Sequence, residues 1–329
     1  MHRVVVTDYL QPPAWVEERE LAGVATVECL QARRTAELAG RIEDADGILL
    51  FHEVSLPAEL IHRLERCRVI VRGGVGFDNV DLAAARARGI TVCHVPDYGV
   101  DEVADHAIGL MLAVNRGWVG VERRLRRHLE PWDKRAVEPV SRLAGQTFGV
   151  IGLGRIGAAT ALRARAFRMR VIACDPYLRP GLEKVYGVPL VDLDTLLRES
   201  DVVSVHTPLN DETRGLLGSR ALSLMKRGAI LINTSRGAVV DTEALADALE
   251  SGHISGAGID VLPSEPPTGE ERLVKLWRED RNPLVNLILT PHTAFYSEEA
   301  VMEIRVKAAQ EIRRVLGGAP PRNPVEASR

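Results

Sequence analysis

The sequence is poor in cysteine and in long apolar runs, and it has little excess of charge of either sign. It holds four cysteines in 329 residues, and none of them belongs to a CxxC motif. At least two of them close apolar runs that are typical of strands, so we expect buried free thiols in a reducing cytoplasm rather than a disulfide framework. The four are Cys29, Cys67, Cys93 and Cys174.

No apolar stretch approaches the roughly 20 residues that cross a bilayer, and the first residues show no basic segment followed by an apolar core. We therefore expect no membrane span, no signal peptide and a cytoplasmic location. The formal net charge of −3 predicts no nucleic-acid partner and no acidic membrane partner. No HExxH motif or Cys/His cluster is present, so we expect no metal site.

What is present is an alternation of short β-rich runs with helical patterns, which is typical of parallel α/β sheets. The length of 329 residues suits two domains. In the first hundred residues we expect five strands and a doubly wound domain; the strands are 3–7, 24–28, 48–51, 69–71 and 91–93. After a helical stretch at 101–114, a second series begins at Thr147; its strands are 148–151, 171–174, 202–205, 229–233, 256–259 and 286–289.

Three helices have recognisable ends. Pro57 opens a helical pattern that runs to about Arg66, and Asp81 can cap the start of the next helix. Apolar residues recur at helical spacing from Val301 to Val315, with Ser297 as a cap and Gly317 at the exit.

The polar residues that follow the expected strands indicate where a ligand would bind. Ligands of open parallel sheets bind outside the carboxyl ends of the strands. In the second series these positions carry a glycine-rich turn at 152–157, Asp175, His206, the run 234–237, Asp260 and His292; in the first they carry Asp8, His52, the run 72–76 and His94. The two sheets can face each other with the ends that carry these polar residues, which predicts one cleft between two domains.

The turn GLGRIG (152–157) matches a dinucleotide-binding fingerprint, because it follows a strand and opens a helix. Gly152 permits the tight turn, Gly154 lets a pyrophosphate approach the backbone, and Gly157 lets the helix pack on the strand. Asp175 stands where an acid would bind the adenosine ribose hydroxyls and would repel the 2′-phosphate of NADP. We therefore expect NAD as the cofactor.

Longer motifs extend the match over essentially the whole chain. They are GVIGLGRIG (149–157), CDPY (174–177), VHTPLNDETRGLL (205–217), ILINTSRGAVVDTEAL (230–245), GIDVLPSEPP (258–267), LTPHTAFYSEEA (289–300) and VIVRGGVGFDNVDL (69–82). With these motifs the sequence resembles the D-2-hydroxyacid dehydrogenases. Arg72 and the tetrad AFYS (294–297) make it most similar to the C-terminal binding protein branch.

This resemblance implies a two-domain α/β protein with a flavodoxin-like substrate domain and a Rossmann NAD-binding domain. The substrate domain would comprise 1–100 plus 296–329, and the NAD-binding domain, 101–295, would be inserted into it. The resemblance also implies a homodimer that is built largely from 99–145.

Hydride transfer to or from C2 of a 2-oxo or 2-hydroxy acid needs an acid/base and an anchor for the acid. His292 can exchange the proton of the C2 oxygen at neutral pH. Glu265 would bind the other ring nitrogen, and Arg236 can hold the substrate carboxylate and keto oxygen with its planar fork. The family pattern assigns the same three roles to the matching residues.

The resemblance implies further contacts. The backbone amides of Val75 and Gly76 would cradle the substrate carboxylate, Arg72 would add a second positive contact, and Asp260 would hold the nicotinamide carboxamide. The expected cofactor-binding residues are Val75, Gly152, Gly154, Arg155, Ile156, Gly157, Asp175, His206, Thr207, Pro208, Thr213, Thr234, Ser235 and Asp260. The expected substrate-binding residues are Arg72, Val75, Gly76, Arg236, His292 and Phe295.

Two departures and one alternative stay open. Phe295 stands where the C-terminal binding proteins carry tryptophan, which puts a shared substrate in doubt. The stretch 268–284 is longer than the usual connection, and its Leu276 and Trp277 predict a short helix. The alternative to an enzyme is a dimeric NADH-sensing binding protein, like the eukaryotic corepressors of that branch; the catalytic trio does not separate the two.

Overall fold

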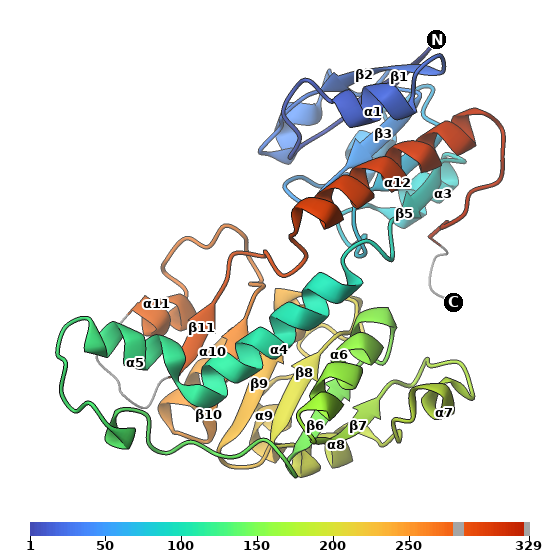
Figure 1. Cartoon of the computed structure of the whole chain (residues 1–329). Helices are drawn as coiled ribbons and strands as arrows, with labels where there is room; N and C mark the ends of the chain where they lie inside the picture. The colour runs from blue at the N-terminus through green and yellow to red at the C-terminus, as the bar shows by residue number, and fades with distance from the viewer. Residues whose placement is uncertain (279–285, 326–329) are drawn as a thin grey trace. The chain divides into compact units, whose positions relative to one another are not determined.

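The structure is a computed structural model that describes residues 1–278 and 286–325. The chain divides into two compact units (Figure 1). Unit 1 consists of Met1–Tyr98 with Ser297–Arg329, and unit 2 consists of Gly99–Tyr296. Both units are α/β folds on all-parallel sheets, which confirms the fold class expected from the sequence.

Unit 1 carries a five-stranded sheet in the order β2-β1-β3-β4-β5, which is the flavodoxin-like order. Its strands are β1 (His2–Val6), β2 (Ala25–Cys29), β3 (Gly47–Leu50), β4 (Val69–Arg72) and β5 (Thr91–His94). Its helices are α1 (Trp15–Glu20), α2 (Ala58–Ile61), α3 (Leu82–Ala87) and α12 (Glu298–Leu316), with the 3₁₀ helix η1 (Thr35–Leu38). Ile48 and Leu50 of β3 share one core with Ile61 of α2 and Ala85 of α3, while α12 packs against β3 and β4.

Helix α12 returns the end of the chain to unit 1, where it lies beside α1 (Figure 1). Ser297 caps it as expected, because its Oγ accepts a hydrogen bond of 2.9 Å from the amide of Ala300. A bidentate ion pair fixes it to α1: Arg305 donates to the two carboxylate oxygens of Glu17 at 2.9 and 2.7 Å. The Glu17 carboxylate is buried, so this pair holds α12 in register on α1.

Unit 2 carries a six-stranded sheet in the order β11-β10-β9-β8-β6-β7. Its strands are β6 (Thr147–Ile151), β7 (Arg170–Cys174), β8 (Val202–Val205), β9 (Ala229–Asn233), β10 (Ile254–Ile259) and β11 (Leu287–Leu289). Leu190 adds a parallel bridge to Ala173 at the outer edge of β7. With that bridge counted as a rudimentary third strand, the order is the one typical of dinucleotide-binding folds.

Helices cover both faces of this sheet. They are α4 (Val100–Arg116), α5 (Trp118–Leu125), α6 (Arg155–Ala166), α7 (Leu182–Tyr186), α8 (Leu193–Glu199), α9 (Ser219–Leu224), α10 (Thr242–Glu250) and α11 (Arg272–Arg278), with the 3₁₀ helices η2 (Lys134–Ala136) and η3 (Gly237–Val239). Ile230 and Ile232 of β9 pack in one core with Met111 of α4, and Leu231 between them packs in the other with Leu245 of α10. This alternation explains the nearly continuous apolar strands of the sequence.

One local prediction was wrong, and another holds only in part. The helix expected to run from Pro57 to about Arg66 ends at Ile61, because the backbone continues in tighter turns, with the amides of Arg63 and Leu64 bonded three residues back. All four thiols are free, as expected, but only Cys93 is fully buried and the other three are half-buried.

The short helix expected within 268–284 is confirmed as α11, where Leu276 is buried. Arg272 fixes α11 to α10 through ion pairs with Asp247 and Glu250. The remainder of that stretch, 279–284, lies outside the described residues. Over the described part of the chain, none of the helices has the length and apolar character needed to cross a membrane.

Candidate active site

The candidate residues of unit 2 stand at the carboxyl ends of its parallel strands, which share one edge of the sheet. The glycine-rich turn follows β6, and Asp175 follows β7. His206 follows β8, and the run 234–237 follows β9. Asp260 follows β10, and His292 lies three residues after the end of β11.

The glycine-rich turn has the shape that a bound pyrophosphate needs. Gly152 has φ +90°, and a Cβ on it would lie 2.7 Å from the carbonyl oxygen of His206. A Cβ on Gly157 would lie 2.0 Å from the carbonyl oxygen of Gly152, so that only glycine lets α6 approach β6. Gly154 precedes the first residue of α6, and no atom of the described residues lies within 4 Å of the Cβ position there. The positive end of α6 is thus open to an anion.

Asp175 is held beside this turn. Its carboxylate accepts hydrogen bonds from the backbone amides of Leu153 at 2.8 Å and Tyr177 at 3.0 Å. The Tyr177 hydroxyl in turn donates to the Glu212 carboxylate. A carboxylate in this position suits the ribose hydroxyls of a dinucleotide. The carboxylates of Asp175 and Glu212 together disfavour a 2′-phosphate.

His206 is uncharged in the folded protein at neutral pH. Burial lowers its pKa to about 4, and its Nε2 lies 2.8 Å from the Ser204 hydroxyl. The loop that follows is internally braced, since the Thr213 hydroxyl donates to the Pro208 carbonyl at 2.7 Å. The expected cofactor residues Thr207, Pro208 and Thr213 therefore belong to one loop after β8, which this hydrogen bond closes.

The turn after β9 presents Arg236 through contacts that the motif alone did not reveal. Asn233, fully buried at the end of β9, donates to the Arg236 carbonyl at 3.0 Å and accepts from the amide and hydroxyl of Ser235. A Cβ on Gly237 would lie 2.0 Å from the carbonyl carbon of Leu262, so this glycine permits the close approach of two loops. The approach brings the Arg236 charge near enough to Glu265 to lower the pKa of its carboxyl group.

Glu265 and His292 form a close acid–imidazole pair. Nδ1 of His292 lies 2.6 Å from Oε2 of Glu265, and the other carboxylate oxygen accepts a 2.8 Å bond from the Leu262 amide. Burial raises the pKa of Glu265, but the His292 hydrogen bond and charge, with the Leu262 amide and Arg236, outweigh it, and the net pKa lies below the usual value. Glu265 is therefore ionised at neutral pH and suited to orient an imidazole and stabilise its charge.

Asp260 organises the turn that carries His292. Its carboxylate is buried and accepts from the Thr290 hydroxyl at 2.5 Å and from the amides of Thr293 and Ala294, each at 3.0 Å. The Phe295 ring follows this turn and meets the His292 ring edge-on, with 6.3 Å between centroids. The expected contact between Asp260 and a carboxamide stays a prediction.

In unit 1 the expected substrate residues gather after β4. The Arg72 side chain is buried, and its Nη1 donates to the Gly73 carbonyl at 2.9 Å. A Cβ on Gly74, at φ +154°, would overlap Nη1 of Arg72, so the guanidinium lies directly against the glycine loop. His94, at the end of β5, donates through Nδ1 to the Val75 carbonyl at 2.7 Å and so braces the loop that carries the amides of Val75 and Gly76.

The described residues fit a dinucleotide and offer no metal centre. At the end of β9 the buried Thr234 hydroxyl has no hydrogen-bond partner among the described residues, which suits a contact with a ligand atom. Across the same described ranges, no group of three or more His, Cys, Asp or Glu residues could hold a metal ion.

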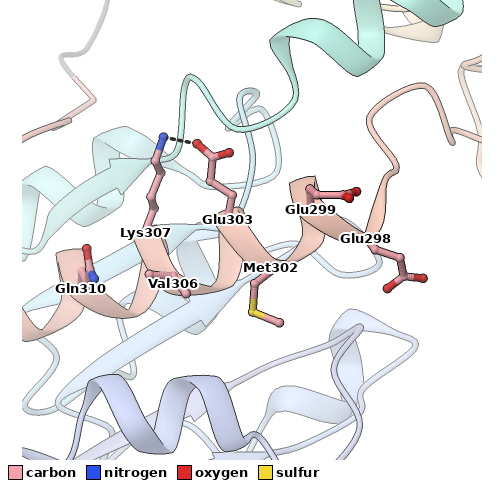
Figure 2. A pocket seen from close by; sticks show the side chains of 7 residues that line it. All are labelled: Glu298, Glu299, Met302, Glu303, Val306, Lys307 and Gln310. Carbon is pink, nitrogen blue, oxygen red and sulfur yellow. Dashed lines mark ion pairs between the residues drawn. The ribbon is translucent and has the colours of Figure 1, made fainter.

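A surface hollow on unit 1 does not suit this chemistry. It measures about 620 Å³ and is lined only by side chains of α12 (Figure 2). Three of these are the carboxylates Glu298, Glu299 and Glu303, and the Lys307 ammonium is already 2.5 Å from Glu303 and 2.8 Å from Asp97. An acidic hollow of this kind repels both a carboxylate substrate and a pyrophosphate.

Comparison with known proteins decides the family. Residues 108–294 match the model described as the D-isomer specific 2-hydroxyacid dehydrogenase, NAD binding domain. The chain belongs to this family. Unit 2 is accordingly its NAD-binding domain, and the cofactor is NAD.

Curated relatives of this dehydrogenase family include two that are named D-3-phosphoglycerate dehydrogenase. The protein of Archaeoglobus fulgidus is 36% identical over 299 residues, which cover 91% of this chain and 55% of that relative. The protein of Methanocaldococcus jannaschii is 36% identical over 319 residues, which cover 97% of this chain and 58% of that relative. The chain thus spans little more than half the length of these relatives.

Solved structures of the family match over nearly the full chain. A D-lactate dehydrogenase from Aquifex aeolicus, complexed with NAD and lactic acid, is 30% identical with a TM-score of 0.85 and 96% coverage of both chains. A glyoxylate reductase from Paecilomyes thermophila is 29% identical with a TM-score of 0.86 and 98% coverage of both chains. The similarity to the C-terminal binding protein branch in particular stays a prediction.

Proposed function

We propose that this protein is an NAD-dependent dehydrogenase that transfers a hydride between NAD(H) and C2 of a small D-2-hydroxy or 2-oxo acid. The observation that carries the proposal is the 2.6 Å contact between His292 and Glu265, with the Arg236 charge acting on the same carboxylate. An acid/base, its orienting carboxylate and an anion anchor are what this reaction requires of the protein.

The cofactor supplies or accepts the hydride, and the residues of the chain handle the proton and the charge. In the direction of reduction, Arg236 binds the substrate carboxylate and polarises the C2 carbonyl. His292 then gives the proton of its Nε2 to the C2 oxygen, since its Nδ1 faces Glu265. Glu265 stabilises the imidazolium that precedes this transfer. In oxidation the neutral His292 removes the hydroxyl proton instead.

For the remaining contacts the proposal follows the roles that the family pattern implies. The turn 152–157, Asp175, the residues after β8 and β9, and Asp260 would bind NAD, and the buried Thr234 hydroxyl supports such a role. Val75 and Gly76, with Arg72 against the same loop, would bind the substrate carboxylate, and Phe295 would contact its side chain. In this scheme unit 1 is the substrate domain, and the cytoplasmic location stays a prediction.

We also propose a homodimer. The segment that the family resemblance assigns to the interface exposes large apolar side chains: Trp118, Leu129 and Trp132 are 55%, 68% and 75% exposed. Helix α5 has no buried residue of its own. Exposed aromatic residues beside arginines are typical of protein interfaces. Light scattering of the purified protein tests this, and a monomer at micromolar concentration would refute it.

The first test of the enzyme is NADH consumption with a panel of 2-oxo acids, from glyoxylate and pyruvate to branched, aromatic and thioether acids. We expect rapid turnover with one class and loss of that turnover in His292→Ala, while NADH still binds. Tight NADH binding without turnover of any acid would contradict the proposal and favour the NADH-sensing binding protein. Loss of NADH binding in His292→Ala would contradict the role given to His292.

A further inference from the structure

Three polar side chains form a hydrogen-bonded row next to the turn that carries His292. Nε2 of His106, in α4, lies 3.0 Å from the Thr290 hydroxyl and 3.6 Å from Oδ1 of Asp260. The Thr290 hydroxyl lies 2.5 Å from the same carboxylate oxygen. The three residues come from α4, from the end of β11 and from the end of β10, so they meet only in the folded unit 2.

The direction of the bonds in this row follows from the number of protons available. A threonine hydroxyl has one proton, and the short contact with the Asp260 carboxylate requires that this proton point to Asp260. Nε2 of His106 must then be the donor to the Thr290 oxygen. His106 is therefore held with a proton on Nε2 and gives Thr290 the hydrogen bond that it cannot obtain from Asp260.

The Asp260 carboxylate at the end of the row is the anchor of the His292 turn. This carboxylate accepts hydrogen bonds from the amides of Thr293 and Ala294. The backbone carbonyl of Asp260 accepts a 2.8 Å bond from the amide of His292. His292 has φ +54°, a left-handed conformation that is unfavourable for a residue with a side chain. Such a conformation persists only where surrounding bonds over-determine it, and Asp260 supplies those bonds on both sides of His292.

We propose that His106 is a positioning residue for the reaction: through Thr290 it fixes the Asp260 carboxylate, and thereby the turn that sets His292 against Glu265. This inference rests on the proposed role of His292 as the acid/base. His106 does not touch the reacting atoms in this scheme. Its effect is transmitted by the row, because a carboxylate buried as deeply as Asp260 needs donors on all sides to keep one orientation.

The row predicts a loss that falls mainly on the chemical step and much less on cofactor affinity. If the turn relaxes, the imidazole of His292 moves away from Glu265 and from the C2 oxygen, and displacements of this kind cost rate strongly. The glycine-rich turn and Asp175, which would carry most of the NAD contacts, share no hydrogen bond with the row in the described structure. Asp260 itself is an expected contact of the nicotinamide, so we expect a large fall in kcat and only a small rise in the KM for NADH.

Matched variants separate positioning from a merely structural role. His106→Leu removes the donor, His106→Gln keeps an amide proton near the place of Nε2, and His106→Asn carries the same amide on a side chain that is too short. We expect kcat to fall about tenfold in His106→Leu and His106→Asn, and to stay within about threefold of wild type in His106→Gln. Thr290→Val should match His106→Leu, and the double variant should be no slower than either.

A readout that does not depend on turnover accompanies the kinetics. The short Nδ1–H bond to Glu265 should give a downfield imidazole proton resonance, which His292→Ala assigns by its absence. We expect this resonance in wild type and His106→Gln, and its broadening or loss in His106→Leu and His106→Asn. An unaltered resonance in all variants, or equal kcat values for His106→Gln and His106→Asn, would overturn the inference. Absence of turnover in wild type with the resonance pattern intact would overturn only the proposed function.

Discussion

The imidazole Nδ1 of His292 lies 2.6 Å from the Glu265 carboxylate, although the two residues belong to different loops of unit 2. Each is fixed by a backbone contact to the loop that follows β10. The Leu262 amide binds the second oxygen of Glu265, and the His292 amide binds the Asp260 carbonyl. Because both sides are held, the pair is set before a substrate arrives, which is the preorganisation that acid–base catalysis requires.

Replacing Glu265 with glutamine tests the charge of this pair. The amide keeps a hydrogen-bond acceptor but removes the negative charge that favours the imidazolium. We expect kcat with the best 2-oxo acid to fall about a hundredfold, with the NADH dissociation constant within twofold of wild type. Steady-state kinetics and fluorescence titration measure the two. Glu270→Gln, which changes an exposed charge, is the control, and a Glu265→Gln variant as active as this control would contradict the role of the pair.

Changing Gly154 or Gly152 of the cofactor turn to alanine should affect different properties, NADH binding in the first case and thermal stability in the second. At Gly154 the Cβ meets no atom, so Gly154→Ala should fold with unchanged stability but bind NADH at least tenfold more weakly, because the methyl group would meet the pyrophosphate. At Gly152 the Cβ clashes with the His206 carbonyl and φ is +90°, so Gly152→Ala should lose thermal stability even without cofactor. Melting curves with and without NADH compare the two. Unweakened NADH binding in Gly154→Ala would place the pyrophosphate elsewhere.

Gly237 should be a structural requirement of the Arg236 loop. In Gly237→Ala the methyl group would lie 2.0 Å from backbone atoms of Leu262, which cannot give way as a flexible side chain would. We expect a loss of about 2 kcal/mol or more in the free energy of unfolding and a raised KM for the 2-oxo acid as Arg236 moves. Gly109→Ala, in a helix and with no atom near its Cβ, is the control and should be neutral or stabilising. Urea denaturation measures the free energy of unfolding of both variants, and equal values would contradict the structural role of Gly237.

His206 should make the stability of the protein depend on pH. Its pKa is about 4 in the folded protein and 6.5 when unperturbed. Between these values the unfolded chain binds the proton and the folded chain does not, so the free energy of unfolding rises with pH in this window and is lower by about 3 kcal/mol at its acid end. His206→Gln, which can keep the bond to Ser204, should remove this slope. Urea titrations at pH 4.5, 5.5 and 7 of both proteins measure the difference, and parallel pH profiles would contradict it.

The sequence by itself determined the order of elements and most of the chemistry. Apolar runs of three to six residues became strands because both faces of each sheet are covered. The glycine spacing of 152–157 could be recognised because only glycine fits the local backbone there. The residues at the strand ends could be named for the same reason. In a parallel sheet the topology alone brings them to one edge.

Only the tertiary structure decided what holds those residues in place. His106 and Thr290 meet across 184 positions of sequence, and no periodicity signals such a contact. His94 likewise acts through a bond to the Val75 carbonyl, which belongs to a loop after a different strand. The end of α2 at Ile61 was also decided by the tertiary structure, since tighter turns follow it where the sequence has a helical pattern. The sequence thus names the reacting groups, whereas their orientation depends on hydrogen bonds between segments that are distant in the chain.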